Sequence, residues 1–115
     1  MDKSSNRSDT PMKRLAFKMK LKSGFREEYI RRHNAIWPEL KALLSSTGVR
    51  DYTIYLDTGS NTLIAVQSQD GEKSSQDLGE DPVVQKWWKY MSDIMETNPD
   101  FSPVSVPLEV VFHMD

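Results

Sequence analysis

Residues 51–69, DYTIYLDTGSNTLIAVQSQ, predict a hairpin of two β-strands. In the first half, Tyr52, Ile54 and Leu56 recur at every second position, which places them on one face of a strand. The central letters TGSN are turn-forming residues, and TLIAVQSQ then returns as a second apolar stretch. Two consecutive strands joined by a tight turn are therefore expected to pair antiparallel.

The segment before this hairpin predicts one strand and a broken helix. Residues 14–22, RLAFKMKLK, alternate strictly between apolar and mostly basic side chains, as a half-buried strand does. Because Pro38 lacks an N–H group and disfavours helical geometry at the preceding residue, we expect two helical pieces joined at residues 34–37, ending before Gly48. Their apolar positions follow helical spacing: Phe25, Tyr29, His33, Ile36, Trp37, Leu40, Leu43 and Leu44.

The segment after the hairpin predicts a polar loop with one short helical turn, a second helix and a last strand. Asp81 and Pro82 are typical of a helix N-cap and first helical residue. The helix has a broad apolar face made of Val83, Val84, Trp87, Trp88, Met91, Ile94 and Met95. Residues 108–115, LEVVFHMD, predict the fourth strand. The order β-α-β-β-α-β indicates an α+β, ferredoxin-like fold with helices on one face of an antiparallel sheet.

Length and composition indicate one cytoplasmic domain. The chain has 115 residues, of which residues 1–11 are polar and predict a flexible tail, leaving residues 12–115 as a single domain. The tail lacks the apolar core of a signal peptide, and no apolar run approaches the roughly 20 residues of a membrane span. The net charge of −2 gives no general attraction for nucleic acid or anionic membranes.

Several common chemistries lack their motifs in this sequence. There is no cysteine, and neither His33 nor His113 belongs to an H-x-x-x-H or H-E-x-x-H pair, so we expect no metal site. Glycine-rich phosphate loops and the G-x-S-x-G element of serine hydrolases are also absent. We therefore expect no nicotinamide or flavin cofactor.

The face of the sheet opposite the helices needs a cover or must be solvated. Thr53 and Tyr55 in the second strand and Val111 with His113 in the fourth are expected on that face. Small domains of this type often bury it against a second copy. Lys18 and Lys20 argue against complete burial, because lysines are rarely fully buried. A partly wet dimer interface and a monomer with a solvated face both fit the pattern.

His33 has two interpretations. It lies one helical turn after Tyr29, so its imidazole and the tyrosine hydroxyl can point into the same space. An imidazole with an ordinary pKa near 6.5 can donate and accept protons at neutral pH. Spacing alone nevertheless favours a structural histidine that is hydrogen-bonded to a carbonyl group near the break at Pro38.

The pair Trp87-Trp88 has two interpretations as well. A wide apolar stripe can bury both rings, and spacing alone favours this core role. Exposed indoles, in contrast, stack on sugar rings and donate hydrogen bonds to hydroxyl groups. Because neighbouring helical residues point about 100° apart, we expect one indole to face a ligand and the other to pack. Tyr52 and Tyr90 are ordinary strand and helix aromatics by the same spacing test.

Four segments resemble, in the same order, segments of the L-rhamnose mutarotases. They are EEYIRRHNAIWPEL (27–40), DYTIYLD (51–57), WWKYMSDIM (87–95) and NPDFSPVSVPLEVVF (98–112). The resemblance runs from about Lys13 to the end of the chain and includes rare residue pairs. The departures are Ala35, where the family often has proline, and the basic Lys18 and Lys20 in the first strand.

The resemblance implies a cofactor-free homodimer of ferredoxin-like subunits, the dimeric α+β barrel, that interconverts the α and β anomers of L-rhamnose. It assigns proton donation to His33 and sugar binding to Tyr29, Tyr52, Trp87 and Trp88. Three alternatives stay open: a mutarotase for another aldose such as L-fucose, a cofactor-free monooxygenase-like enzyme on the same fold, and a non-catalytic sugar-binding protein.

Overall fold

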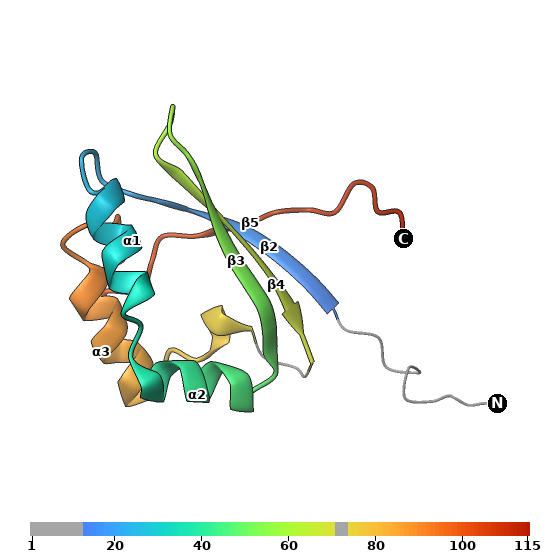
Figure 1. Ribbon diagram of the computed structural model, residues 1–115, viewed down its shortest axis with the longest axis horizontal. Coiled ribbons are helices and arrows are strands. Elements are labelled where there is room, and N and C mark those ends of the chain that lie inside the picture. Colours follow the sequence, from blue (N-terminus) through green and yellow to red (C-terminus); the bar gives the residue numbers. More distant parts are fainter. Residues whose placement is uncertain (1–12, 71–73) are drawn as a thin grey trace.

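In residues 13–70 and 74–115, which the structure describes, four antiparallel strands form one sheet and three α-helices lie on one side of it (Figure 1). This computed structural model has the strand order β3-β4-β2-β5, with β2 (Lys13–Lys20), β3 (Val49–Asp57), β4 (Thr62–Gln69) and β5 (Val106–Pro107). The helices are α1 (Arg26–Asn34), α2 (Pro38–Ser46) and α3 (Pro82–Met91), and η2 (Ser75–Asp77) is a 3₁₀ turn. The predicted α+β class is confirmed, whereas the predicted tail, residues 1–11, lies outside the described residues.

The predicted hairpin forms the centre and one edge of the sheet. β3 and β4 are antiparallel, with Leu56 opposite Leu63 and Ile54 opposite Ala65. β4 occupies the predicted residues 62–69, and β3 begins two residues before the predicted start. The side chains of Leu63 and Ala65 are fully buried beneath the helices. The period-two pattern therefore identified the correct core face.

The first strand and the broken helix also agree with the sequence pattern. β2 buries Phe17 and Met19, as predicted, but ends at Lys20; the buried Leu21 forms an isolated bridge with Met95. α1 ends at Asn34 and α2 begins at Pro38, with the intervening Trp37 extended at φ −61° and ψ 132°. Pro38 thus starts the second helix, because its fixed φ suits the first helical position.

The last helix is shorter than predicted. Asp81 caps it, accepting a hydrogen bond from the Val83 N–H group at 2.9 Å, and Pro82 is the first helical residue. However, α3 ends at Met91, and Ile94 and Met95 lie beyond it. Both remain buried, because the chain turns back and the Lys22 N–H group donates to the Ile94 carbonyl group. Their apolar character was predicted correctly, but it belongs to a loop that packs on the core.

The predicted fourth strand, residues 108–115, is wrong. The strand is β5, two residues long, which pairs Val106 with Lys18 and Pro107 with Phe17. One further hydrogen bond joins the Leu108 N–H group to the Ala16 carbonyl group, and residues 109–115 then run without a strand (Figure 1). Strand-forming composition needs a surface to cover. Within the described residues the apolar side chains of this segment find none, and Val111 is 90% exposed.

Candidate functional site

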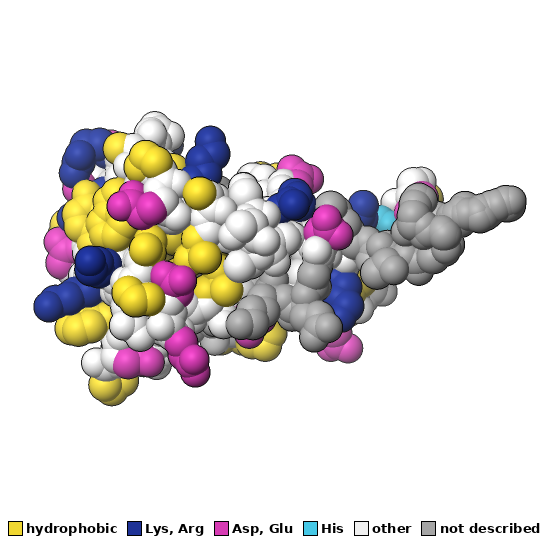
Figure 2. All heavy atoms as spheres, turned by 90° about the horizontal axis from the view of Figure 1, so that it is seen from below, with side chains coloured by type: hydrophobic (Ala, Val, Ile, Leu, Met, Phe, Trp, Pro, Cys, Tyr) yellow, Lys and Arg dark blue, Asp and Glu magenta, His cyan; other side chains and the backbone are white. Residues whose placement is uncertain are grey.

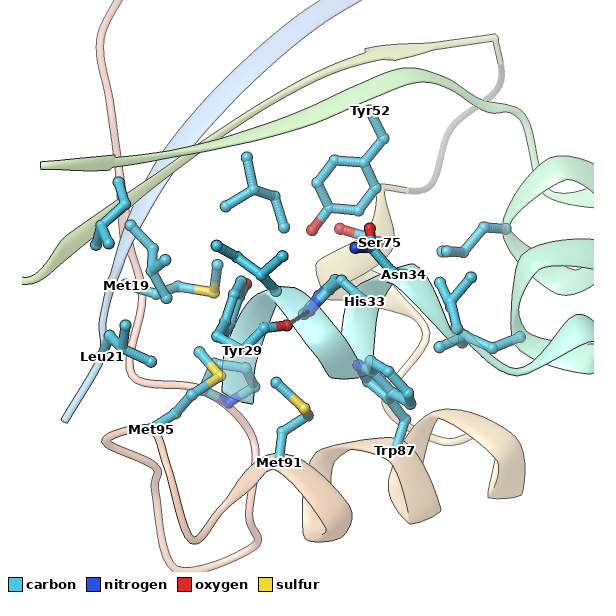
Figure 3. Close-up of a pocket in the computed structure, with 18 of the residues that line it drawn as sticks. Met19, Leu21, Tyr29, His33, Asn34, Tyr52, Ser75, Trp87, Met91 and Met95 are labelled. Carbon is cyan, nitrogen blue, oxygen red and sulfur yellow. Dashed lines mark hydrogen bonds between the residues drawn. The ribbon is translucent and has the colours of Figure 1, made fainter. Parts of the chain in front are cut away.

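A cavity of about 850 Å³ lies between the helices and the covered face of the sheet. All five residues predicted for the site line it, from three different elements: Tyr29 and His33 from α1, Tyr52 from β3, and Trp87 and Trp88 from α3. Figure 3 shows Tyr29, His33, Tyr52 and Trp87 around the same space. The second histidine, His113, lies instead in the exposed C-terminal segment beside Arg14.

Tyr29 and His33 form a stacked pair on α1. Their ring centroids are 4.2 Å apart with an interplanar angle of 26°. The Nδ1 atom of His33 lies 3.1 Å from the Tyr29 carbonyl oxygen, which can only accept a hydrogen bond. This contact assigns the hydrogen to Nδ1, so in a neutral imidazole Nε2 carries the lone pair.

Burial sets the protonation of this pair. Desolvation lowers the pKa of His33 below its ordinary value, and the contact with the Tyr29 carbonyl group raises it only partly back. Burial also raises the pKa of the Tyr29 hydroxyl, with a further contribution from Tyr52 nearby. At neutral pH the site therefore holds an uncharged imidazole that can accept a proton and a phenol that keeps its own.

Aromatic rings surround this pair. Trp87, only 8% exposed, meets His33 edge to face at 5.4 Å and Trp37 at 5.1 Å. Tyr90 stacks on Trp37 at 5.6 Å between centroids. Edge-to-face and offset contacts of this kind favour a defined ring orientation. Tyr29, His33 and Trp87 line the cavity, and Trp37 and Tyr90 pack against Trp87; we call these five residues the aromatic side.

Trp88 lies in a different environment from Trp87. Its ring packs against the backbone of Gly79, where an added Cβ atom would come within 2.8 Å of Cη2 of the indole. It also borders a shallow hollow on the outer surface, together with Lys89 and Phe101. Trp87 is thus the indole that contacts His33, whereas Trp88 packs against the loop before α3 and also lines the cavity.

A buried arginine packs against the aromatic side at Tyr90. Arg32 donates to the carboxylates of Glu28 at 2.7 Å and Asp93 at 2.8 Å, and to the Tyr90 carbonyl group at 2.7 Å. Its guanidinium also lies 4.4 Å from the centre of the Tyr90 ring. Arg32, which precedes His33 on α1, therefore joins this helix to the end of α3.

Seen from the helix side, charged and hydrophobic side chains mix over this end of the molecule (Figure 2).

One corner of the cavity is polar. The hydroxyl of Tyr52 faces the Ser75 hydroxyl (Figure 3), and burial raises the pKa of Tyr52 although the nearby Ser75 hydroxyl lowers it. The Ser75 Oγ atom accepts a hydrogen bond from the Gln67 side-chain nitrogen at 2.9 Å, and the Ser75 N–H group donates to the Gln67 side-chain oxygen at 3.0 Å. We call Tyr52, Ser75 and Gln67 the polar corner; Figure 3 shows Tyr52 and Ser75 facing one another.

A β-bulge places Tyr52 in this corner. The register between β3 and β4 shifts between Arg50 and Thr53, so Asp51 and Tyr52 together lie opposite Gln67. Asp51 has a φ of 51°, a conformation that is uncommon outside glycine. Bulges of this type redirect one side chain and are frequent beside functional sites.

The sequence pattern did not identify Ser75, Gln67 or Arg32. Ser75 lies in a polar loop, and Gln67 was one polar letter in a strand, so neither carried a spacing signal. Arg32 follows the exposed Arg31 and resembles any surface arginine in sequence. Among the described residues, no group of three or more His, Asp or Glu side chains is placed to hold a metal ion. No helix in residues 13–70 and 74–115 has the length and apolarity needed to cross a membrane.

Comparisons with known proteins agree on one family. A family model described as L-rhamnose mutarotase matches residues 14–114. L-Rhamnose mutarotases from Phocaeicola vulgatus and Bacteroides thetaiotaomicron are 64% and 65% identical over 104 residues, covering 90% of this chain and all of each relative. The crystal structure of an L-rhamnose mutarotase from Formosa agariphila matches with a TM-score of 0.84 at 51% identity, covering 90% of this chain and 99% of that one.

Proposed function

Because this chain belongs to the L-rhamnose mutarotase family, we propose that it interconverts the α and β anomers of L-rhamnose. The observation that carries the proposal is the position of His33: an imidazole with Nδ1 held by a carbonyl group, on the wall of a cavity lined by indole rings and hydroxyl groups. The cavity volume lies in the range of about 300–1,000 Å³ that is typical of small-molecule sites.

Anomer exchange needs only proton transfers and a bond rotation. The anomeric hydroxyl loses a proton while the ring oxygen gains one, and the C1–O5 bond breaks. The open-chain aldehyde turns about C1–C2, and the ring closes with the proton transfers reversed. A positioned acid and a positioned base each contribute roughly 10²–10⁴-fold to such a step.

We assign the base in ring opening to His33. The resemblance implies a proton donor at this position, but the lowered pKa favours an imidazole that is neutral before the reaction. Nε2 then accepts the proton of the anomeric hydroxyl on opening and returns it on closure, so His33 is the donor in the second half. A hydroxyl donor, either Tyr52 or a water molecule, supplies the proton to the ring oxygen and recovers it on closure.

The aromatic side suits a 6-deoxy sugar. L-Rhamnose has a methyl group where most hexoses carry a hydroxymethyl group, so the wall around that carbon needs no polar partner. We propose that the Trp87 indole contacts this apolar part of the sugar. A contact of methyl size is worth only about 1–3 kcal/mol, so selection against other sugars depends more on hydrogen bonds to the ring hydroxyls.

We also propose that two copies pair through the bare faces of their sheets, as ferredoxin-like halves of a dimeric α+β barrel. The support is a strand order of β3-β4-β2-β5, with the helices on one face only. On the opposite face Tyr55 is 60% exposed. The C-terminal segment adds Val110, Val111 and Phe112, all mostly exposed, for which a second copy would provide a cover.

Saturation-difference NMR on a panel of aldoses tests the catalytic proposal. We expect rapid exchange between the anomeric signals of L-rhamnose and slower exchange for L-fucose and for hexoses with a hydroxymethyl group. If exchange is fastest for L-fucose, the protein is a mutarotase for that sugar instead. Sugar binding without faster exchange would identify a binding protein. Oxygen uptake with an aromatic substrate would support the monooxygenase-like alternative.

Sedimentation at micromolar concentration tests the dimer. The wild type is expected to sediment as a dimer, and Val111→Glu with Phe112→Glu to weaken it. Glu39→Lys, at an exposed position on helix α2, serves as the control and should leave the dimer intact. A wild-type chain that sediments only at 13 kDa would exclude this assembly.

A further inference from the structure

The polar corner has a single consistent direction of hydrogen bonding. The Ser75 N–H group donates to the Gln67 side-chain oxygen, which fixes the orientation of the amide. The amide nitrogen then points to Ser75 and donates to its hydroxyl oxygen. Gln67 is 1% exposed, so no bulk water competes for these contacts. The Ser75 N–H group can only donate, so the atom of the Gln67 amide that it contacts must be the oxygen. This contact settles which end of the amide is oxygen and which is nitrogen.

The same direction of hydrogen-bond donation extends from Ser75 to Tyr52. The hydroxyl of Ser75 has one hydrogen; among the described residues the Gln67 side chain donates to its oxygen, and the Tyr52 hydroxyl faces it across the edge of the cavity (Figure 3). Gln67 already occupies the role of donor, so the Ser75 hydrogen is directed to the Tyr52 oxygen. Leaving it without an acceptor would be costly, because Ser75 is buried. The Tyr52 hydrogen must then point elsewhere, and Tyr52 lines the cavity.

We propose that Gln67 and Ser75 are positioning residues that orient the Tyr52 hydroxyl so that it donates a hydrogen bond to an oxygen of the bound sugar. This inference rests on the proposed function and adds to it that Tyr52 is the donor, and the sugar oxygen the acceptor, in their hydrogen bond. The bulge at Asp51 and Tyr52 is the backbone feature that sets this arrangement, because it brings the Tyr52 hydroxyl to the same place as the two side chains opposite. Tyr52 then specifies a sugar oxygen that can accept.

Three substitutions test the proposal through anomer exchange of L-rhamnose. Tyr52→Phe removes the donor, and we expect kcat/KM to fall at least about 10-fold, the worth of one hydrogen bond, and further if Tyr52 also supplies the proton to the ring oxygen. Ser75→Ala leaves Tyr52 in place without its partner and should lose nearly as much, whereas Ser75→Thr keeps the hydroxyl and should restore most of the activity. In the Tyr52→Phe background, Ser75→Ala should have almost no further effect.

Gln67→Glu provides the sharpest test, because it keeps the shape and reverses the direction. An ionised carboxylate only accepts, so Ser75 would donate to it, Tyr52 would donate to Ser75, and the donor to the sugar would be lost. We expect a defect similar to that of Tyr52→Phe at neutral pH, which becomes smaller relative to wild type as the introduced carboxyl group is protonated at lower pH. A role in packing alone predicts that activity and melting temperature change together with pH, whereas the proposal predicts an activity defect at pH values where the variant is fully folded.

The outcomes separate this inference from the function on which it rests. A wild-type protein that does not exchange the anomers of L-rhamnose overturns the proposed function. Wild-type exchange, together with wild-type activity of Ser75→Ala and Gln67→Glu, overturns the positioning role. Ser75→Thr as defective as Ser75→Ala also overturns it, because the hydroxyl would then not be the feature that matters. Circular dichroism and melting curves of each variant establish that folded protein is compared.

Discussion

The aromatic side and the polar corner both contribute residues to the lining of one cavity, but different interactions order them. Ring contacts at 4.2–5.6 Å connect Tyr29, His33 and Trp87 to their neighbours, and Arg32 anchors them from behind. The polar corner depends on directional hydrogen bonds between Gln67 and Ser75 at 2.9 and 3.0 Å. Ring packing tolerates small shifts, whereas a hydrogen bond fixes which atom donates. The aromatic side should therefore control rate, stability and the binding of the apolar part of the sugar, and the polar corner the recognition of individual sugar oxygens.

The largest expected effect is the loss of the base. His33→Ala should lower the catalysed rate of anomer exchange by roughly 10²–10⁴-fold, because it removes the group that accepts and returns the anomeric proton. Saturation-difference NMR measures the rate, and His113→Ala, which changes the exposed histidine, is the matched control. Near wild-type exchange in His33→Ala would mean that His33 is only a core histidine. The aromatic side would then have no direct part in catalysis.

Trp87 and Trp88 are expected to differ, although they are neighbours. Trp87→Ala should lower affinity for L-rhamnose about 10–200-fold, because it removes the apolar wall next to His33. It should also lower the melting temperature, since a buried indole is lost. Gly79→Ala provides a matched change at Trp88, because the added methyl group pushes that ring without touching Trp87.

Gly79→Ala should lower the melting temperature and leave sugar affinity within about 2-fold, since overpacking mainly costs stability. Titrations followed by NMR and thermal melts measure both quantities. A collapse of affinity in Gly79→Ala with normal affinity in Trp87→Ala would exchange the roles of the two indoles.

Arg32 should affect folding more than sugar recognition. Arg32→Met removes charge-assisted hydrogen bonds to Glu28, Asp93 and the Tyr90 carbonyl group, and we expect the free energy of unfolding to fall by about 2–3 kcal/mol. The control is Arg31→Met, because Arg31 is largely exposed and pairs with Glu28 at the surface, where ion pairs contribute little. Urea denaturation measures the difference. If Arg32→Met keeps wild-type stability but loses sugar affinity, Arg32 belongs to recognition instead.

The two sides also differ in how far the sequence could predict them. Tyr29, His33 and Trp87 lie on helices whose apolar spacing is visible in the chain, so their convergence follows from periodicity. Ser75 comes from a polar loop whose composition says nothing about its partner. The bulge that brings Tyr52 to Ser75 depends on the register of two strands, which alternation alone does not fix.

The same reasoning explains the incorrect fourth strand. Residues 108–115 have the composition of a strand, but a strand also needs an edge to pair with and a face to cover. β5 pairs only at Val106 and Pro107, and the rest of the segment projects from the body (Figure 1). Local composition therefore predicted a strand that does not form, because a strand also depends on surfaces that sequence periodicity does not describe.

The smallest expected effect is a change in stability with pH that comes from the aromatic side alone. Burial lowers the pKa of His33 in the folded protein below the unfolded value of about 6.5. As the pH falls through 6.5, the unfolded chain binds a proton that the folded chain does not. The contribution of His33 to the free energy of unfolding should therefore be constant above about pH 7. It should fall below pH 6.5, with a slope of at most about 1.4 kcal/mol per pH unit.

His33→Ala should abolish this slope, and Tyr52→Phe should retain it, because burial raises the pKa of Tyr52 and keeps it protonated across this range. Arg31 and Arg32 lower the pKa of Glu28 to about 2, and Arg32 also lowers the pKa of Asp93. The stabilisation from these carboxylates is present above their unfolded pKa values, near 4, and is lost only below them, outside the histidine window. Urea denaturation between pH 5 and 8 gives the difference between wild type and variant. Equal slopes in wild type and His33→Ala would show that the imidazole is not held neutral by burial, and the assignment of the base in ring opening would fail with it.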